Sequence, residues 1–340
     1  MKKILKKRIT TDLKPWKKTD KEKINRELEK YYQKNKFKQI LVKLEIVNNN
    51  LKRADFSHIK SFYVTRANAI TRMIKFCLSK TKQNFDDIIF YITMKDTIID
   101  DKLPILGYSK QMDQIGLLFP DWTFQIPYKS EINTYWHNQI REIDNKCSRI
   151  NFDQKEDVIF FQGQDTSKGF SELGMKFKTN IRRNLKTIAE ENNQNQEIPM
   201  EILIDDEPKT RITTWCNNKY LLDLPGAHFW SVRFKELMLT GSITIKVDNL
   251  IPNINFYSDI FKAKKDYVQV FYTNAENQEE KYKNAEKCYH DIYQEINKLT
   301  PEKIKSMITS SREKIVKMDN RVLNYYIETM LEEYQKTFLM

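Results

Sequence analysis

Asp96 and Arg233 are charged residues next to apolar segments, where a carboxylate or a guanidinium could take part in catalysis or binding. Asp96 comes shortly after the nearly all-apolar run 88–93, and Arg233 is the single charged residue within the stretch 229–234. A carboxylate can take a proton from a hydroxyl group. A guanidinium can bind a phosphate through two parallel hydrogen bonds. The sequence therefore offers one acid–base group and one anion-binding group.

Both residues also have an ordinary structural interpretation. If Arg233 is buried it needs a partner, and Asp223 is a nearby carboxylate, so an internal ion pair is as compatible with the local pattern as an anion site. A lone aspartate after a strand commonly caps a turn or a helix. The local residues alone favour the cap for Asp96.

The elements that must position these residues alternate between strands and helices. The segment 64–78 has the apolar spacing of a helix, and long amphipathic helices are expected from 301 onward. Short apolar runs, which suit strands buried on both faces of a parallel sheet, separate the helices and loops. The expected strands are 38–47, 88–93, 158–161, 220–224 and 243–247. The alternation predicts an α/β fold.

Polar residues follow three of these strands, at 95–96, 162–166 and 225–233. In open parallel sheets, ligands bind beyond the carboxyl ends of the strands, where loops and helix N-termini meet. We therefore expect the functional groups in these three segments. The polar stretch 190–197 is expected to be an exposed loop because it has no apolar residues to bury.

The positive charge is concentrated at the start of the chain. The net charge is +12, and residues 1–36 contain fourteen Lys and Arg against five Asp and Glu, which leaves +3 for the rest. Nucleic-acid binding needs a basic face on the folded body, so we expect no such partner. Segment 1–36 is interpreted as a solvated basic arm with a short amphipathic helix around Ile24, Leu28 and Tyr31. Peripheral contact with an anionic membrane surface is the alternative.

The sequence shows neither a secretory signal nor a membrane span, so a cytoplasmic protein is expected, with peripheral contact at the inner membrane face as a variant. The four cysteines are widely spaced and are interpreted as ordinary thiols. The four histidines have no metal-ligand spacing, so no metal is expected.

Several blocks of the chain resemble family 90 glycosyltransferases, which include capsule-associated and lipopolysaccharide-modifying enzymes and protein O-glucosyltransferases. The main block is KYLLDLPGAHFWSVRFKELMLTGSITIKV at 219–247. Others are PILGYSK at 104–110, LLFPDWTF at 117–124 and YYIETMLEEY at 325–334. They occur in the family's order and extend over about residues 38–336.

The resemblance implies an α/β fold of GT-B type, with two Rossmann-like domains facing across a cleft and C-terminal helices closing back on the first. Residues 37–150, with the helix 310–340 packing back, are expected to form the acceptor-side domain. Residues 151–309 are expected to bind a nucleotide sugar.

The resemblance places Arg233 on the family's phosphate-contacting arginine and Asp96 on its catalytic aspartate, the base of an inverting transfer. It also implies contacts with the donor at Ser231, Val232, His228, Gly163, Thr166 and Arg182. On the acceptor side it implies Tyr108, Ser109, Lys110, Asp121 and Trp122. Trp122 can stack on a sugar or fill the core.

The chain departs from the family's pattern at 162–166. Here it reads QGQDT, where the family has a loop of RGSRT type whose arginines face the donor. Asp165 repels a diphosphate unless a cation offsets it, and Lys168, Lys176, Arg182 and Arg183 are the candidate cations. Trp230 stands where the family has a small residue, so it either narrows the sugar pocket or fills the core.

The resemblance thus implies a metal-independent hexosyl- or pentosyltransferase. Its donor is expected to be a UDP-sugar, with glucose or xylose as the sugar, and its acceptor a hydroxyl group of a glycan or surface polysaccharide. No cofactor is expected. The altered loop keeps open an alternative from another class, a catalytically inactive relative that binds glycans or acts as a scaffold.

Overall fold

A computed structural model describes residues 1–35, 38, 40–54, 59–85, 87–100, 102–124, 136–165, 181–205, 210–226 and 231–338. The chain divides into two compact units. Unit 1 contains residues 1–139, 254–260 and 318–340, and unit 2 contains 140–253 and 261–317. The first division falls at 139/140, before the expected boundary at 150. Segment 1–36 belongs to unit 1.

Unit 1 is a mixed sheet with helices. Its strand order is β2-β1-β3-β4-β6, and β1 is antiparallel to β2 and β3, whereas β3, β4 and β6 are parallel. The strands are β1 (Leu41–Val47), β2 (Asn50–Ala54), β3 (Ile88–Thr93), β4 (Leu106–Gly107), β5 (Lys110–Gln111) and β6 (Leu117–Leu118). The expected strand 88–93 is confirmed, but one of its neighbours is antiparallel.

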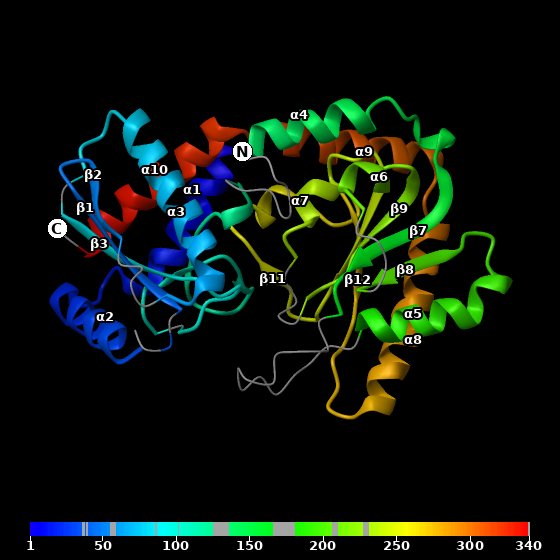
Figure 1. Cartoon of the computed structure of the whole chain (residues 1–340), viewed down its shortest axis with the longest axis horizontal. Coiled ribbons are helices and arrows are strands. Elements are labelled where there is room, and N and C mark those ends of the chain that lie inside the picture. The colour runs from blue at the N-terminus through cyan, green and yellow to red at the C-terminus, as the bar shows by residue number, and fades with distance from the viewer. Residues whose placement is uncertain are drawn as a thin grey trace. The chain divides into compact units, whose positions relative to one another are not determined.

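The helices of unit 1 include both ends of the described chain. They are α1 (Lys2–Leu13), η1 (Lys14–Trp16), α2 (Lys21–Asn35), α3 (Ser61–Lys80), η3 (Trp122–Phe124), η7 (Ser258–Ile260) and α10 (Asn320–Phe338). α1 and α10 lie side by side, dark blue and red in Figure 1. The C-terminal helix therefore packs in unit 1.

The start of the chain is not a solvated arm. α1 buries Leu5 and Ile9, which are 0% and 2% exposed, because its apolar residues recur at helical spacing. The expected amphipathic helix is α2, and it buries Ile24 and Leu28. It buries Tyr32 rather than Tyr31, which is half-buried.

Unit 2 has a fully parallel sheet with strand order β12-β10-β9-β7-β8. Its strands are β7 (Glu156–Gly163), β8 (Met200–Ile204), β9 (Asn218–Asp223), β10 (Ile243–Asp248) and β12 (Val268–Phe271), and β11 (Asn253–Ile254) lies at the boundary between units. The strands expected at 158, 220 and 243 are confirmed.

The helices of unit 2 are α5 (Ile181–Asn192), α6 (Ile212–Trp215), α7 (Phe234–Leu237), α8 (Gln278–Asn297) and α9 (Pro301–Val316), with η4 (Phe152–Gln154) and η6 (Asn193–Asn195). α4 (Trp136–Cys147) begins in unit 1 and ends in unit 2. The stretch 190–197, expected as a loop, begins as the last turn of α5 and continues into η6.

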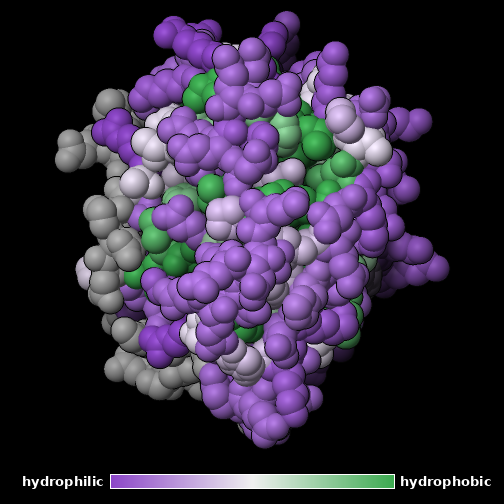
Figure 2. Space-filling model, turned by 90° about the vertical axis from the view of Figure 1, so that its right-hand side faces the viewer, coloured by the Kyte–Doolittle hydropathy of each residue, from purple (hydrophilic) through white to green (hydrophobic). Residues whose placement is uncertain are grey.

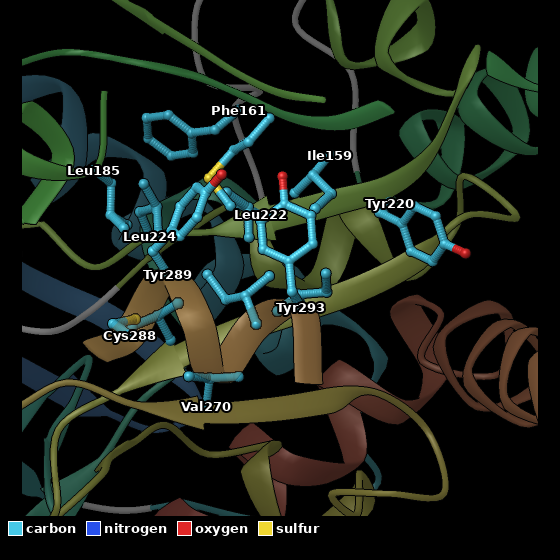
Figure 3. Packing of buried hydrophobic residues seen from close by; sticks show 14 of the residues in the cluster. Ile159, Phe161, Leu185, Tyr220, Leu222, Leu224, Val270, Cys288, Tyr289 and Tyr293 are labelled. Carbon is cyan, nitrogen blue, oxygen red and sulfur yellow. The ribbon is translucent and has the colours of Figure 1, made fainter. Parts of the chain in front are cut away.

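Residues of β7 and β9 alternate between the two faces of the unit 2 sheet. Ile159 and Phe161 of β7 and Leu222 of β9 pack in a large core with α5 and α8 (Figure 3). Phe160 and Leu221 belong to a smaller cluster on the other face. Such a sheet, covered on both faces, is the α/β arrangement that the apolar runs predicted. The outer surface on the side of unit 2 seen in Figure 2 is mainly hydrophilic.

Candidate functional site

The strand order of unit 2 reverses next to β7. From β7 the chain goes to β8 on one side, and then returns to β9 on the other side before continuing outward to β10 and β12. β7 and β9 are therefore the neighbouring strands from which the chain continues to opposite sides of the sheet. Ligands of open parallel sheets bind beyond the strand ends at such a switch point.

Arg233 lies at this switch point. Its Nη1 donates a hydrogen bond of 2.6 Å to the main-chain oxygen of Gln162 in β7. The guanidinium carbon lies 4.7 Å from the centre of the Phe161 ring and 5.9 Å from that of Trp215. These contacts orient a cation at the end of β7. α7 is a single turn with Arg233 as its N-cap residue.

Arg182, the second residue of α5, connects the ends of β7 and β9. Its Nη1 donates to the Gln164 oxygen at 2.6 Å, and its Nη2 donates to the Leu224 oxygen at 3.1 Å. The guanidinium carbon is 5.2 Å from the centre of the Phe161 ring, and the residue is 6% exposed. Arg182 therefore links the ends of β7 and β9. The guanidinium groups of Arg182 and Arg233 both contact the ring of Phe161.

Gly163, the last residue of β7, makes room for Arg233. A Cβ atom at this position would lie 2.7 Å from Cζ of Phe161 and 2.9 Å from Nη1 of Arg233. Any other residue would displace at least one of these groups. The glycine expected near the donor is thus part of the packing that holds Arg233.

Asp165, the acidic residue that follows β7, forms an ion pair with an arginine of α5. Asp165 is buried, and its Oδ2 accepts a hydrogen bond from Nη2 of Arg183 in α5. Of the four candidate cations, Arg183 forms this ion pair and Arg182 holds main-chain oxygens. Lys168 and Lys176 lie outside the described residues. The negative charge of Asp165 is therefore offset locally.

Asp223, at the end of β9, is buried near Arg233. Burial raises the pKa of this carboxyl, while the charge of Arg233 and a hydrogen bond with Ser231 act in the opposite direction. The net direction is upward, because a buried carboxylate loses its hydration. The charges of Arg233 and Asp223 therefore act on each other, while Arg233 Nη1 donates to the main-chain oxygen of Gln162.

Of the other residues expected near the donor, Ser231 and Val232 lie within the described part of the chain. Ser231 Oγ accepts a hydrogen bond from the Arg233 main-chain nitrogen at 3.2 Å, and the Val232 oxygen accepts one from Lys235 Nζ at 2.9 Å. These bonds shape the turn before α7. His228, Thr166 and Trp230 lie outside the described residues.

In unit 1, Asp96 lies three residues beyond β3 and is held by Arg66 of α3. Arg66 Nη1 is 2.6 Å from Oδ1 of Asp96 and 2.9 Å from the Met94 oxygen. The Arg66 guanidinium carbon lies 5.3 Å from the Trp122 ring centre and 5.4 Å from that of Tyr63. The Asp96 side chain remains 34% exposed, so solvent reaches a carboxylate of fixed orientation.

Tyr108 and Ser109 contact the segment that contains Asp96. Ser109 Oγ donates to the Asp96 main-chain oxygen at 2.8 Å, and Tyr108 Oη lies 3.6 Å from Sδ of Met94. Both residues are 0% exposed. In this structure their contacts position the loop after β3.

The remaining residues expected on the acceptor side are also buried or engaged. Lys110 Nζ donates to Asp12 Oδ1 at 2.7 Å and to the Gly116 oxygen at 2.9 Å, so it links α1 to the segment 110–116 within unit 1. Asp121 accepts hydrogen bonds from the main chain and side chain of Thr123. Trp122 is half-buried and packs against Arg66. Trp122 and Asp96 share a contact with Arg66.

Sequence reasoning missed Arg66 and Phe161. The sequence does not single out Arg66, because the expected helix 64–78 also contains Arg72 and Lys75, which are both exposed. No local signal distinguishes Phe161 from other strand residues. Within the described ranges, no group of three or more His, Cys, Asp and Glu residues could hold a metal ion.

Comparison with known proteins agrees with this architecture. No helix in the described parts of the chain is both long and apolar enough to span a bilayer. A search of curated proteins finds no match. The family model described as Glycosyl transferase family 90 matches residues 5–340, nearly the whole sequence. The chain therefore belongs to glycosyltransferase family 90.

Proposed function

We propose that this glycosyltransferase is an inverting, metal-independent enzyme of the GT-B class. In this proposal the donor is a UDP-sugar, with glucose or xylose as the sugar, and the acceptor is a hydroxyl group of a glycan or surface polysaccharide. The observation that carries the proposal is the pair Arg233 and Arg182 at the switch point of the parallel sheet.

The two arginines supply what a leaving diphosphate needs. Hydrogen bonds to main-chain oxygens and contacts with the Phe161 ring orient both cations at the strand ends. Arg233, the less buried of the two, contacts the phosphates, and Arg182 keeps the strand ends in place. Burial raises the pKa of the nearby Asp223 carboxyl, and the positive charge of Arg233 acts against this shift.

Asp96 acts as the base. The acceptor hydroxyl gives its proton to the Asp96 carboxylate while its oxygen attacks the anomeric carbon. The bond from that carbon to the phosphate oxygen breaks on the opposite face, and UDP leaves with the electron pair. Arg66 supports this step by holding Oδ1 of Asp96.

A panel of nucleotide sugars tests the proposal through donor hydrolysis and transfer to glycan acceptors. We expect turnover of at least one UDP-sugar. Asp96→Asn should lower kcat by about 100-fold or more, because general base catalysis contributes about that much. Asp113→Asn, at an exposed position of unit 1, is the matched control and should keep full activity. If no donor is hydrolysed or transferred, the proposed activity is wrong.

The alternative, an inactive glycan-binding or scaffold protein, rests on the altered segment 162–166, which lacks the arginines of the family's loop and contains Asp165. Because Arg183 pairs with Asp165, that residue is a weaker reason to expect loss of donor binding. The two hypotheses still differ in one observable, since an inactive relative would bind glycans without hydrolysing any donor.

A further inference from the structure

The first helix and the turn after it carry an unbalanced positive charge. Residues 1–18 contain eight Lys and Arg against one acidic residue, Asp12, so their net charge is +7. α2 differs, because there Arg26 pairs with Glu22 and Lys30 pairs with Glu27. The excess charge therefore belongs to α1 and η1.

The single acidic residue of this segment is already neutralised. Asp12 is 3% exposed, and its Oδ1 accepts from Lys110 Nζ at 2.7 Å and from Arg8 Nη1 at 3.4 Å. Arg8 also pairs with Asp259 through two hydrogen bonds. The one arginine of the segment, Arg8, is thus engaged in ion pairs, and the exposed cations of the segment are all lysines.

Five of these lysines form what we call the lysine surface: Lys3, Lys7, Lys14, Lys17 and Lys18. All five are exposed. On α1, Lys3 and Lys7 project opposite the buried stripe of Leu5, Ile9 and Leu13, because residues four apart lie on one side of a helix, and Lys14 follows as the C-cap residue. Among the described residues, none of the five forms an ion pair.

The two other exposed lysines of α1 have neighbours. Lys2 Nζ lies 4.8 Å from the ring centre of Tyr325. Lys6 interacts with Glu332 of α10, whose carboxylate also binds Lys336 and Gln83. We therefore leave both outside the lysine surface.

We propose that the lysine surface adsorbs on an anionic phospholipid bilayer. Lysines are flexible point charges, suited to diffuse attraction by many headgroups, whereas nucleic-acid recognition relies on arginine forks and exposed aromatic rings. The one aromatic side chain of this segment, Trp16, is buried and donates from Nε1 to the Lys102 oxygen at 3.2 Å. Ile4 is 37% exposed beside the lysines and can enter the headgroup region.

The proposal is independent of the sugar-transfer activity, and vesicle co-sedimentation of the full chain tests it. Vesicles of phosphatidylcholine alone are compared with vesicles that also contain phosphatidylglycerol, at low salt and at about 0.1 M salt. We expect binding only to the anionic vesicles, and weaker binding at the higher salt.

The decisive variant replaces the five lysines of the lysine surface with glutamine. Its matched control replaces five exposed lysines of unit 2: Lys262, Lys264, Lys265, Lys305 and Lys317. Both variants lose five charges, and thermal melting verifies that both are folded. We expect the first to lower the partition coefficient by about 100-fold or more, since each lysine near the surface contributes several-fold, and the control to change it by less than about 3-fold.

Three results overturn the proposal. One is equal binding to neutral and anionic vesicles, and another is equal loss of binding in the two variants. The third is absence of binding to any vesicle. If, in that case, a single-stranded oligonucleotide binds the protein at about 0.1 M salt and only the first variant loses this affinity, the lysine surface binds nucleic acid instead.

Discussion

Arg66 donates a hydrogen bond to Asp96, with 2.6 Å between Nη1 and Oδ1. The same nitrogen donates to the Met94 oxygen, and the guanidinium packs on Trp122. Arg66 is therefore attached to the end of β3 and holds the Asp96 carboxylate in one orientation. Under the proposed function it is a positioning residue for the base.

Arg66→Ala should lower kcat by about 10- to 100-fold with a small change in the donor KM, because a misoriented base affects the chemical step more than donor binding. Steady-state kinetics with the donor found in the panel measures both constants. Arg72→Ala, at an exposed position of the same helix, is the matched control. A rise in donor KM with unchanged kcat would show that Arg66 does not act through Asp96.

Gly163→Ala should weaken donor binding without unfolding unit 2. The new Cβ would lie 2.9 Å from Arg233 Nη1 and 2.7 Å from Phe161 Cζ, so the guanidinium or the ring must move. Gly241→Ala is the contrasting variant, because that glycine has φ +67° and only Lys155 Nζ near it, at 3.9 Å. It should cost about 1 kcal/mol of stability and leave donor affinity unchanged. Calorimetry and urea unfolding separate the two effects, and the reverse pattern would refute the assignment of Gly163.

Removing Arg183 should expose the charge of Asp165. We expect Arg183→Ala to weaken UDP binding several-fold at low salt, and the double variant with Asp165→Asn to restore it, because the repulsive charge is then gone. Binding titrations of both single variants and the double variant form a complete cycle. Additive effects in that cycle would mean that the ion pair has no influence on the donor.

Stability should depend on pH through Lys155, whose Nζ is buried and donates to the Cys216 and Thr240 oxygens and to Ser242 Oγ. Burial lowers the pKa of Lys155 to about 8 from its ordinary 10.5, against the opposing effect of the Cys216 and Cys147 thiols. Between these values the unfolded chain holds more protons than the folded protein. The free energy of unfolding should therefore rise with pH in this window, by up to about 1.4 kcal/mol per pH unit.

Urea unfolding at pH values within that window tests this prediction. Lys155→Met should remove most of the rise, while Lys305→Met, at an exposed position, should keep it. The same pH dependence in all three proteins would show that Lys155 is not its source.

The sequence predicted most elements whose residues are apolar at regular spacing, such as β3, β7, β9 and β10. It also predicted that the polar residues after these strands matter, because the carboxyl ends of parallel strands meet at one edge. It did not predict the burial of α1, whose many lysines conceal the spacing of Leu5, Ile9 and Leu13.

The details of the candidate site depend on contacts between distant segments, and these have no local signature. The Arg66–Asp96 pair joins residues 30 positions apart, and Arg233 reaches a main-chain oxygen 71 positions away. The contact of Lys110 with Asp12 likewise joins residues that are 98 positions apart in the sequence.

The central claim, that Arg233 at the switch point binds the donor diphosphate, is tested most directly by calorimetry with UDP. The native protein and Arg233→Ala are compared, with Arg211→Ala as the control at an exposed position of unit 2. We predict that the native protein and the control bind UDP and that Arg233→Ala binds it about 10- to 100-fold more weakly, as expected for lost hydrogen bonds to a charged group. Equal affinity of Arg233→Ala and the native protein, or no binding by the native protein, would contradict the claim.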